Sequence, residues 1–225
     1  MTYKGIIFDF NGTLIWDTML HKKAWQAFAR KAGIDFTEKQ YYNDIHGRST
    51  RDIFEILYSR RIEDDELARL SYQKEDLYRK ACLDNPEIYC LAPGVEDFLD
   101  HIAESGIPRT IATASEKMNV DFFVDTLMLD RWFEPELFVY DDGSMAIKPE
   151  PDLYLKASER LNVQPEELVV VEDTYFGVLS AIRAGAGYII VTGPAEDQHE
   201  ELNNLEGIDL FISDFAGIDR NLFSS

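Results

Sequence analysis

Three carboxylates, a lysine and a hydroxyl lie close to the ends of short apolar runs in this chain. Asp9 lies near the end of a mostly apolar run at residues 4–10, and Thr113 ends another at 109–113. Glu172 and Asp173 follow a third run, while Lys148 lies in a proline-rich loop. Ligands of parallel sheets bind where the carboxyl ends of the strands meet. We therefore expect these side chains to converge on one site.

The types of these residues suit chemistry on a phosphoryl group. A carboxylate can attack phosphorus, but two anions approach each other only with a cation between them. Asp9, Glu172 and Asp173 offer the hard oxygen ligands that Mg2+ prefers. Lys148 would hold the nucleophile and the transferring group, while Thr113 and backbone amides would bind the other phosphoryl oxygens. The set predicts Mg2+-dependent phosphoryl transfer.

Apolar runs and helical patterns alternate along most of the chain. The runs predict strands at residues 4–10, 109–113, 137–140, 168–171, 188–191 and 210–213. Apolar residues at helical spacing predict helices at 95–104, 117–128, 153–161 and 175–184. Strands separated by helices form right-handed crossovers. We therefore expect an α/β fold with a doubly wound parallel, Rossmann-like sheet.

The segment that follows the first strand has a different pattern. Residues 17–81 carry apolar side chains at helical spacing, with no strand-like run. Gly33 and Gly47 are expected to end helices, and Thr37 and Ser49 to cap helix N-termini. A linker with two prolines and a glycine follows at 84–94. We expect a core domain of residues 1–15 and 94–225, with a small all-helical cap domain, 16–93, inserted after strand 1.

The charge balance narrows the possible partners. The 42 acidic residues against 22 basic ones give a formal net charge of -20, which repels nucleic acids and anionic membranes. We expect no partner of either kind. The two cysteines cannot form a disulfide framework, and the N-terminus resembles neither a signal peptide nor a membrane span. We expect a cytoplasmic monomer or homodimer.

Four ordered motifs resemble those of the haloacid dehalogenase (HAD) superfamily. They are DFNGT at residues 9–13, the IAT that ends at Thr113, KPEPD at 148–152 and VVEDTYFGV at 170–178. The last two are similar to the branch that includes beta-phosphoglucomutases and phosphoglycolate phosphatases, and the insert resembles that superfamily's small cap. The resemblance implies an aspartyl-phosphate mechanism with Asp9 as nucleophile and Thr113 and Lys148 on the phosphoryl group. It implies a Mg2+ site formed by Asp9, the backbone carbonyl of Asn11, Glu172 and Asp173.

Position 11 departs from the pattern of this superfamily. Most of its phosphatases and mutases carry a second aspartate there, which protonates the leaving group and then activates water. The amide of Asn11 cannot act as an acid or base near neutral pH. General acid-base help is worth roughly 10²- to 10⁴-fold, so we expect slow turnover of esters with poor leaving groups.

Residues that contact the substrate are expected on the insert and after the second strand of the core. His21 lies on the first helix of the insert, where relatives often have histidine, and residues 47–49 resemble the cap loop that contacts the leaving group. For His21 the alternative is an ordinary residue of the helix surface or of interdomain packing, and for Ser49 it is an N-cap role. The candidate substrate-binding residues are His21, Gly47, Arg48, Ser49, Ala114 and Ser115.

The leading hypothesis is a phosphatase of a small phosphorylated metabolite, an enzyme that hydrolyses phosphoric monoesters. The alternative is a nearly inactive protein that binds or senses a phosphorylated metabolite, which Asn11 favours and the metal carboxylates oppose. A sugar-phosphate mutase needs proton transfer at position 11 in both half-reactions, so Asn11 argues against it.

Overall fold

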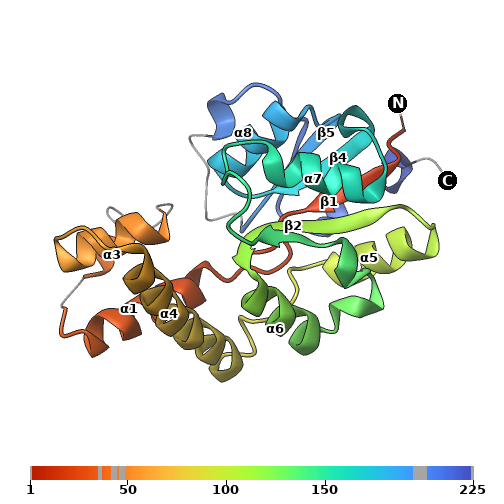
Figure 1. Cartoon of the computed structure of the whole chain (residues 1–225). Helices are drawn as coiled ribbons and strands as arrows, with labels where there is room; N and C mark the ends of the chain where they lie inside the picture. The colour runs from red at the N-terminus through yellow and green to blue at the C-terminus, as the bar shows by residue number, and fades with distance from the viewer. Residues whose placement is uncertain (1, 35–36, 42–44, 46–48, 195–201, 224–225) are drawn as a thin grey trace. The chain divides into compact units, whose positions relative to one another are not determined.

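The computed structural model divides the chain into two compact units, which are described in turn (Figure 1). The first joins Met1–Trp16 to Cys90–Ser225, and the second is Asp17–Tyr89. The structure describes residues 2–34, 37–41, 45, 49–194 and 202–223.

The first unit is built on one parallel sheet, so the predicted doubly wound α/β fold is confirmed. Its six strands run in the order β3-β2-β1-β4-β5-β6. The strands are β1 (Gly5–Phe8), β2 (Arg109–Glu116), β3 (Val139–Asp141), β4 (Leu168–Glu172), β5 (Tyr188–Thr192) and β6 (Leu210–Ile212). Strand β1 pairs with β2 on one side and with β4 on the other. The strands that follow β1 in the chain thus extend the sheet first on one side of β1 and then on the other. This reversal beside β1 is the switch point at which such sheets bind ligands.

Both faces of β1 are covered, which explains its continuous apolar run. Ile7 packs into a core cluster with residues of helices α7 (Asp152–Leu161) and α8 (Tyr175–Ala184). Phe8 points to the opposite face, where its ring contacts Phe98 of helix α5 (Val95–Glu104). Helix α6 (Lys117–Leu127) lies on the same side as α5 (Figure 1). A strand buried on both faces needs apolar residues at every position.

Several strand boundaries differ from the expectation, among them the end of β1, which comes at Phe8 instead of residue 10. Strand β2 continues three residues beyond Thr113, because Glu116 still pairs with Asp141 of β3. Strand β3 begins at Val139 because Pro135–Leu137 forms a turn of 3-10 helix. Further 3-10 turns are Leu129–Arg131, Pro165–Glu167, Leu202–Asn204, Phe215–Gly217 and Arg220–Leu222. The extension of β2 places Ala114 and Ser115 on the strand itself.

The described residues of the second unit form helices and connecting turns, with no strand among them. Its helices are α1 (Thr18–Lys31), α2 (Glu38–Gln40), α3 (Thr50–Tyr58) and α4 (Asp64–Asp84). Its core contains the ring of Trp25, which packs edge-on against Phe54 at a centroid distance of 5.1 Å. This unit interrupts the chain between β1 and β2, where the helical insert was expected. None of the described helices is both long and apolar enough to cross a membrane.

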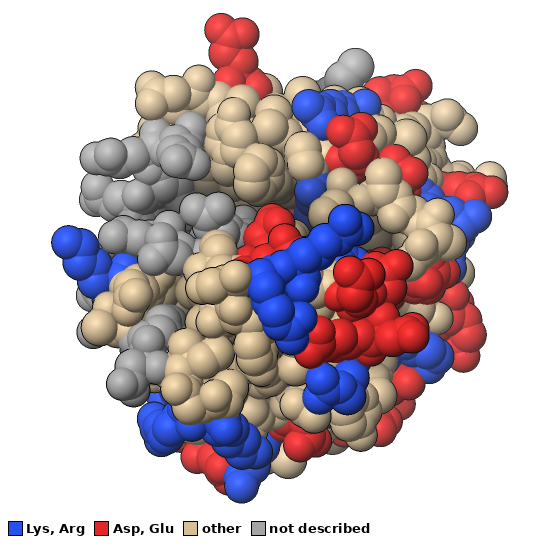
Figure 2. All heavy atoms as spheres, turned by 60° about the vertical axis from the view of Figure 1, so that its left-hand side comes forward, with Lys and Arg blue, Asp and Glu red and all other residues tan. Residues whose placement is uncertain are grey.

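Most of the acidic side chains lie at the surface. Figure 2 shows Asp and Glu interspersed with Lys and Arg over one face of the molecule. Among the described residues, the acidic side chains that are buried are Asp9, Asp17 and Glu172. Burial of a carboxylate requires compensating partners. We therefore look for a functional site among these three buried acids and not among the acids of the surface.

Candidate active site

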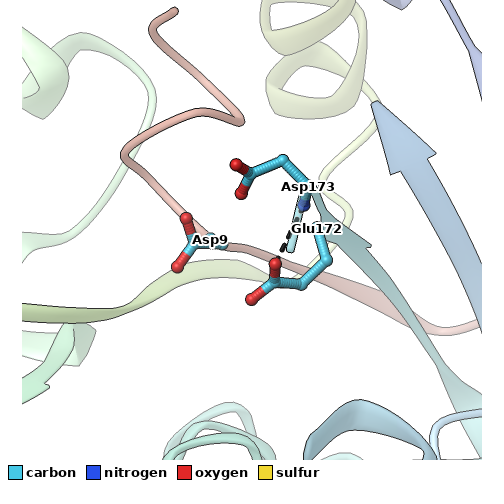
Figure 3. Close-up of side chains that lie close together, drawn as sticks. All are labelled: Asp9, Glu172 and Asp173. Atoms are coloured by element: carbon cyan, nitrogen blue, oxygen red, sulfur yellow. Dashed lines mark hydrogen bonds between the residues drawn. The ribbon is translucent and has the colours of Figure 1, made fainter. Parts of the chain in front are cut away.

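Three acidic side chains converge at the carboxyl end of the sheet. Asp9 follows β1, and its backbone N–H donates to the carbonyl of Val171 in β4. Glu172 ends β4 and Asp173 follows it. One carboxylate oxygen from each of the three lies within 4.8 Å of the others, and Figure 3 shows the carboxylates of Asp9 and Asp173 facing a common space. The pairing of β1 with β4 therefore brings together residues that lie more than 160 positions apart.

Lys148 joins two of these acids. Its Nζ donates to Asp9 Oδ1 at 2.6 Å and to Glu172 Oε1 at 2.5 Å. Burial alone would lower the pKa of Lys148, but the carboxylates of Asp9 and Glu172 raise it well above its usual range. The ammonium group is therefore charged throughout the physiological pH range, beside the proposed nucleophile.

Both oxygens of Glu172 already accept hydrogen bonds from the protein. Oε1 accepts from Lys148 and from the Tyr154 hydroxyl, while Oε2 accepts from Thr174 Oγ1 and from the backbone N–H groups of Asp173 and Thr174. Burial would raise the pKa of Glu172, but Lys148 outweighs it and the pKa is lowered. This network holds a carboxylate in one orientation and suits an anchor for Lys148 better than a direct metal ligand.

Asp173 lies beside two other carboxylates and only one positive charge. Its Oδ1 accepts a hydrogen bond from Thr13 Oγ1 at 3.1 Å. Burial and the negative charges of Glu172 and Asp9 raise the pKa of Asp173 well above its usual range, because the single charge of Lys148 does not offset three carboxylates. A divalent cation would supply the remaining charge, and carboxylate oxygens are the ligands that Mg2+ prefers. The residues therefore fit such an ion.

The loop after β1 brings the next predicted residues together. Gly12 has φ +87°, and its N–H donates to the carbonyl of Ile15, which closes the loop. Asn11 Oδ1 accepts a hydrogen bond from Ser115 Oγ at 2.8 Å, and the backbone N–H of Ser115 donates to Thr113 Oγ1. Thr113 is buried and Ala114 is exposed. Asn11, Thr113 and Ser115 thus form one connected group at the carboxyl ends of β1 and β2.

His21 takes part in a polar cluster within the helical unit. Its Nε2 lies 3.2 Å from Asp17 Oδ2 and its Nδ1 lies 3.0 Å from Lys74 Nζ. The imidazole stacks on Tyr78, whose hydroxyl donates to Asp17 at 2.5 Å. Both ring nitrogens are thus within reach of charged partners of the same unit.

The other substrate-binding candidates on the insert are the residues at positions 47–49. Gly47 and Arg48 lie outside the described residues. Ser49 is the N-cap of α3, where its side chain accepts a hydrogen bond from the backbone N–H of Asp52 at 3.2 Å. This is the capping role that the sequence left open as an alternative.

Two polar residues, one beside the acidic cluster and one in the helical unit, went unnoticed in the sequence. Tyr154 reads as an ordinary apolar position of an amphipathic helix, although it follows the KPEPD motif directly. Lys74 reads as a surface residue of a charged helix, yet its side chain is only 5% exposed. Nothing in a helical pattern indicates that a tyrosine donates to a buried carboxylate. Proximity to the lysine motif is the one signal that points to Tyr154.

Comparisons with known proteins found a matching family model and similar curated proteins. A family model described as haloacid dehalogenase-like hydrolase matches residues 3–185. Hexitol phosphatase A of Escherichia coli (strain K12) is 31% identical over 199 residues, which cover 87% of this chain and 86% of that protein. A fructose-1-phosphate phosphatase of the same organism is 28% identical, covering 81% and 93%.

A solved structure extends the likeness to the whole fold. The HAD hydrolase, family IA, variant 3 from Entamoeba histolytica HM-1:IMSS superposes with a TM-score of 0.89 at 34% identity. The match covers 97% of this chain and 96% of that one. The likeness therefore includes both the α/β unit and the helical unit.

Proposed function

Since the chain belongs to the haloacid dehalogenase-like hydrolase family, we propose that it is a Mg2+-dependent phosphatase of a small phosphorylated sugar or polyol. The observation that carries the proposal is the contact of Lys148 Nζ with both Asp9 and Glu172. That contact places a permanent cation beside a buried carboxylate at the switch point of the sheet. A carboxylate held in this way suits attack on phosphorus.

In the first step, a carboxylate oxygen of Asp9 attacks the phosphorus atom. A bond forms between this oxygen and phosphorus, while the bond from phosphorus to the ester oxygen breaks, which leaves an aspartyl phosphate and an alkoxide. Lys148 offsets the negative charge of the transferring group, and the Thr113 hydroxyl donates to one of its oxygens. Asp9, Asp173 and the backbone carbonyl of Asn11 would hold Mg2+, which reduces the repulsion between the carboxylate and the phosphate.

The proton for the leaving alkoxide must come from water. Asn11 lies where the family's second aspartate would protonate this oxygen, and an amide has no proton to give near neutral pH. The second step is attack of water on the phosphorus of the aspartyl phosphate, which releases inorganic phosphate and restores the Asp9 carboxylate. The amide of Asn11 cannot remove the proton of that water either. Both steps are therefore slower than they would be with a carboxylate at position 11.

The proposed substrate class rests on relatives and on the helical unit. The two Escherichia coli relatives are named for a hexitol and for fructose 1-phosphate. We propose that the helical unit is a cap domain, residues 16–93, that closes over the site and excludes bulk water. A closed site admits only small substrates, which agrees with a sugar or polyol phosphate.

The decisive experiment is a hydrolysis assay on a panel of sugar and polyol phosphates. Wild type with Mg2+ should release phosphate from at least one of them, while EDTA or Asp9→Asn should lower the rate by roughly 10³-fold or more, because the nucleophile or its cation is lost. Asp130→Asn, which changes an exposed acid in a 3-10 turn, is the matched control and should retain activity. Unchanged hydrolysis in Asp9→Asn or in EDTA would refute the mechanism.

Asn11 supports one alternative, a nearly inactive protein that binds a phosphorylated metabolite. Such a protein would bind a sugar phosphate in the presence of Mg2+ and release no phosphate even at high enzyme concentration. A mutase is the less favoured option, because it needs proton transfer at position 11 twice. Interconversion of sugar phosphates with a bisphosphate activator would support it.

A further inference from the structure

Tyr154 lies beneath the proposed active site, in the first turn of α7. Its side chain is only 1% exposed. The helix begins at Asp152, four residues after Lys148. The loop that carries Lys148 and the helix that carries Tyr154 are therefore one continuous segment.

Two separate parts of the Tyr154 side chain contact the site. The hydroxyl donates to Glu172 Oε1 at 2.7 Å, the same oxygen that accepts from Lys148. The ring faces the ammonium group of Lys148, whose Nζ lies 5.1 Å from the ring centroid. The side chain thus contacts both members of the Lys148–Glu172 ion pair, one with its polar end and the other with its aromatic face.

The two contacts restrain the ion pair in different ways. The hydroxyl donates to a carboxylate, and a hydrogen bond to a charged acceptor is stronger than one between neutral groups. The negative face of the ring attracts a cation. These two interactions restrict the positions that the flexible lysine side chain can adopt.

We propose that Tyr154 is a positioning residue that holds Glu172 and Lys148 in the geometry required for phosphoryl transfer. The inference rests on the proposed function, and it adds a residue that no catalytic motif of the sequence contains. Tyr154 does not touch the reacting atoms. It acts through Lys148, whose ammonium group must lie close to both Asp9 and the transferring phosphoryl group.

Two variants separate the contributions of the hydroxyl and the ring. Tyr154→Phe keeps the ring over Lys148 and removes the donor to Glu172, and we expect kcat to fall roughly tenfold with KM changed less than about threefold. Tyr154→Leu removes both contacts and should lower kcat further, by about another threefold or more. The matched control is Tyr3→Phe, which loses a hydroxyl bond to the Gly187 carbonyl at the opposite end of β1. It should leave kcat unchanged.

A second readout does not depend on activity. Tyr154→Phe and Glu172→Gln are combined, and the free energy of unfolding is measured for each single variant and for the double variant. Because the two side chains share a hydrogen bond, we expect their effects to be non-additive, whereas those of Tyr3→Phe and Glu172→Gln should add. Additive effects for Tyr154 would overturn the inference.

The remaining outcomes distinguish this inference from the proposed function. Absence of hydrolysis by wild type on the whole panel would reject the function. An active wild type, an inactive Asp9→Asn variant and a Tyr154→Phe variant with normal kcat would reject only the positioning role. A Tyr154→Phe variant that loses far more stability than Tyr3→Phe, with its kcat loss explained by unfolded protein, would also overturn it.

Discussion

Ser115 Oγ donates a hydrogen bond to Asn11 Oδ1 across 2.8 Å and so joins the end of β2 to the loop after β1. The side chain of position 11 is thereby fixed at the carboxyl edge of the sheet. A carboxylate at position 11 could accept the same hydrogen bond from Ser115. Replacement of the amide by a carboxylate would therefore restore an acid-base group without requiring a new arrangement of the loop.

Asn11→Asp should raise the turnover of esters with poor leaving groups roughly tenfold or more, because the leaving oxygen gains a proton donor. The measurement compares kcat on a sugar phosphate with kcat on an activated aryl phosphate, for which proton donation matters less. The gain should be larger for the sugar phosphate, because only its first step depends strongly on a proton donor, whereas the second step is common to both substrates. An equal rate for both proteins would show that position 11 does not limit turnover.

The assay on wild type needs a chemical control. Asn11 precedes Gly12, a dipeptide prone to deamidation, which would convert Asn11 to the aspartate that the chain lacks. Fresh protein and peptide mapping at Asn11 should accompany each rate. Activity that grows as the preparation ages would point to the converted fraction.

Mg2+ should stabilise the protein more at high pH than at low pH. The raised pKa of Asp173 means that the folded protein binds this proton more tightly than the unfolded chain. The contribution of this group to the stability of the folded protein is therefore lost as pH rises from the ordinary Asp pKa of about 3.9 towards the raised value. Mg2+ binds only the ionised carboxylate, so the rise in unfolding temperature on adding Mg2+ should be larger at about pH 8 than at about pH 5.

The control for this prediction is Asp173→Asn. Without Mg2+ at about pH 8 it should unfold at a higher temperature than wild type, since one of three crowded charges is removed. It should also lose most of the response to Mg2+. Equal responses of wild type at the two pH values would contradict a metal ligand at Asp173.

Gly177→Ala should disable the site by displacing Glu172. A Cβ at Gly177 would lie 1.8 Å from Glu172 Oε1, the oxygen that binds Lys148. Because the carboxylate must move, we expect kcat to fall by at least about tenfold and the free energy of unfolding to fall by about 1 to 3 kcal/mol. Gly217→Ala, whose Cβ would meet Ile212 at 3.3 Å, is the matched control. Normal activity in Gly177→Ala would show that Glu172 can move without harm.

Ser49 offers a test that separates helix capping from substrate contact. Ser49→Ala should lower the free energy of unfolding by about 1 kcal/mol, because the N–H of Asp52 loses its acceptor, and Ser49→Asp should restore it. If Ser49 only caps α3, both variants keep the KM of wild type. A raised KM in both would indicate contact with the substrate instead.

Much of the fold could be predicted because its signals are local. Residues 5–8 of β1 and 168–171 of β4 each form an unbroken apolar run, as is typical of strands covered on both faces. The helical pattern of the insert needed no knowledge of distant residues either. Among the boundaries that differed, the end of β2 depends on its pairing with β3, which a single segment does not encode.

The sequence by itself determined which residues are candidates for the chemistry, and only the tertiary structure decided how they are connected. The motifs identified Asp9, Lys148 and Asp173, because their residue types and order are typical of one family. The hydrogen bond from Tyr154 to Glu172 depends on the packing of α7 against the sheet, which brings side chains from separate segments within about 3 Å. Such contacts arise from packing of the whole core, so no local sequence pattern predicts them.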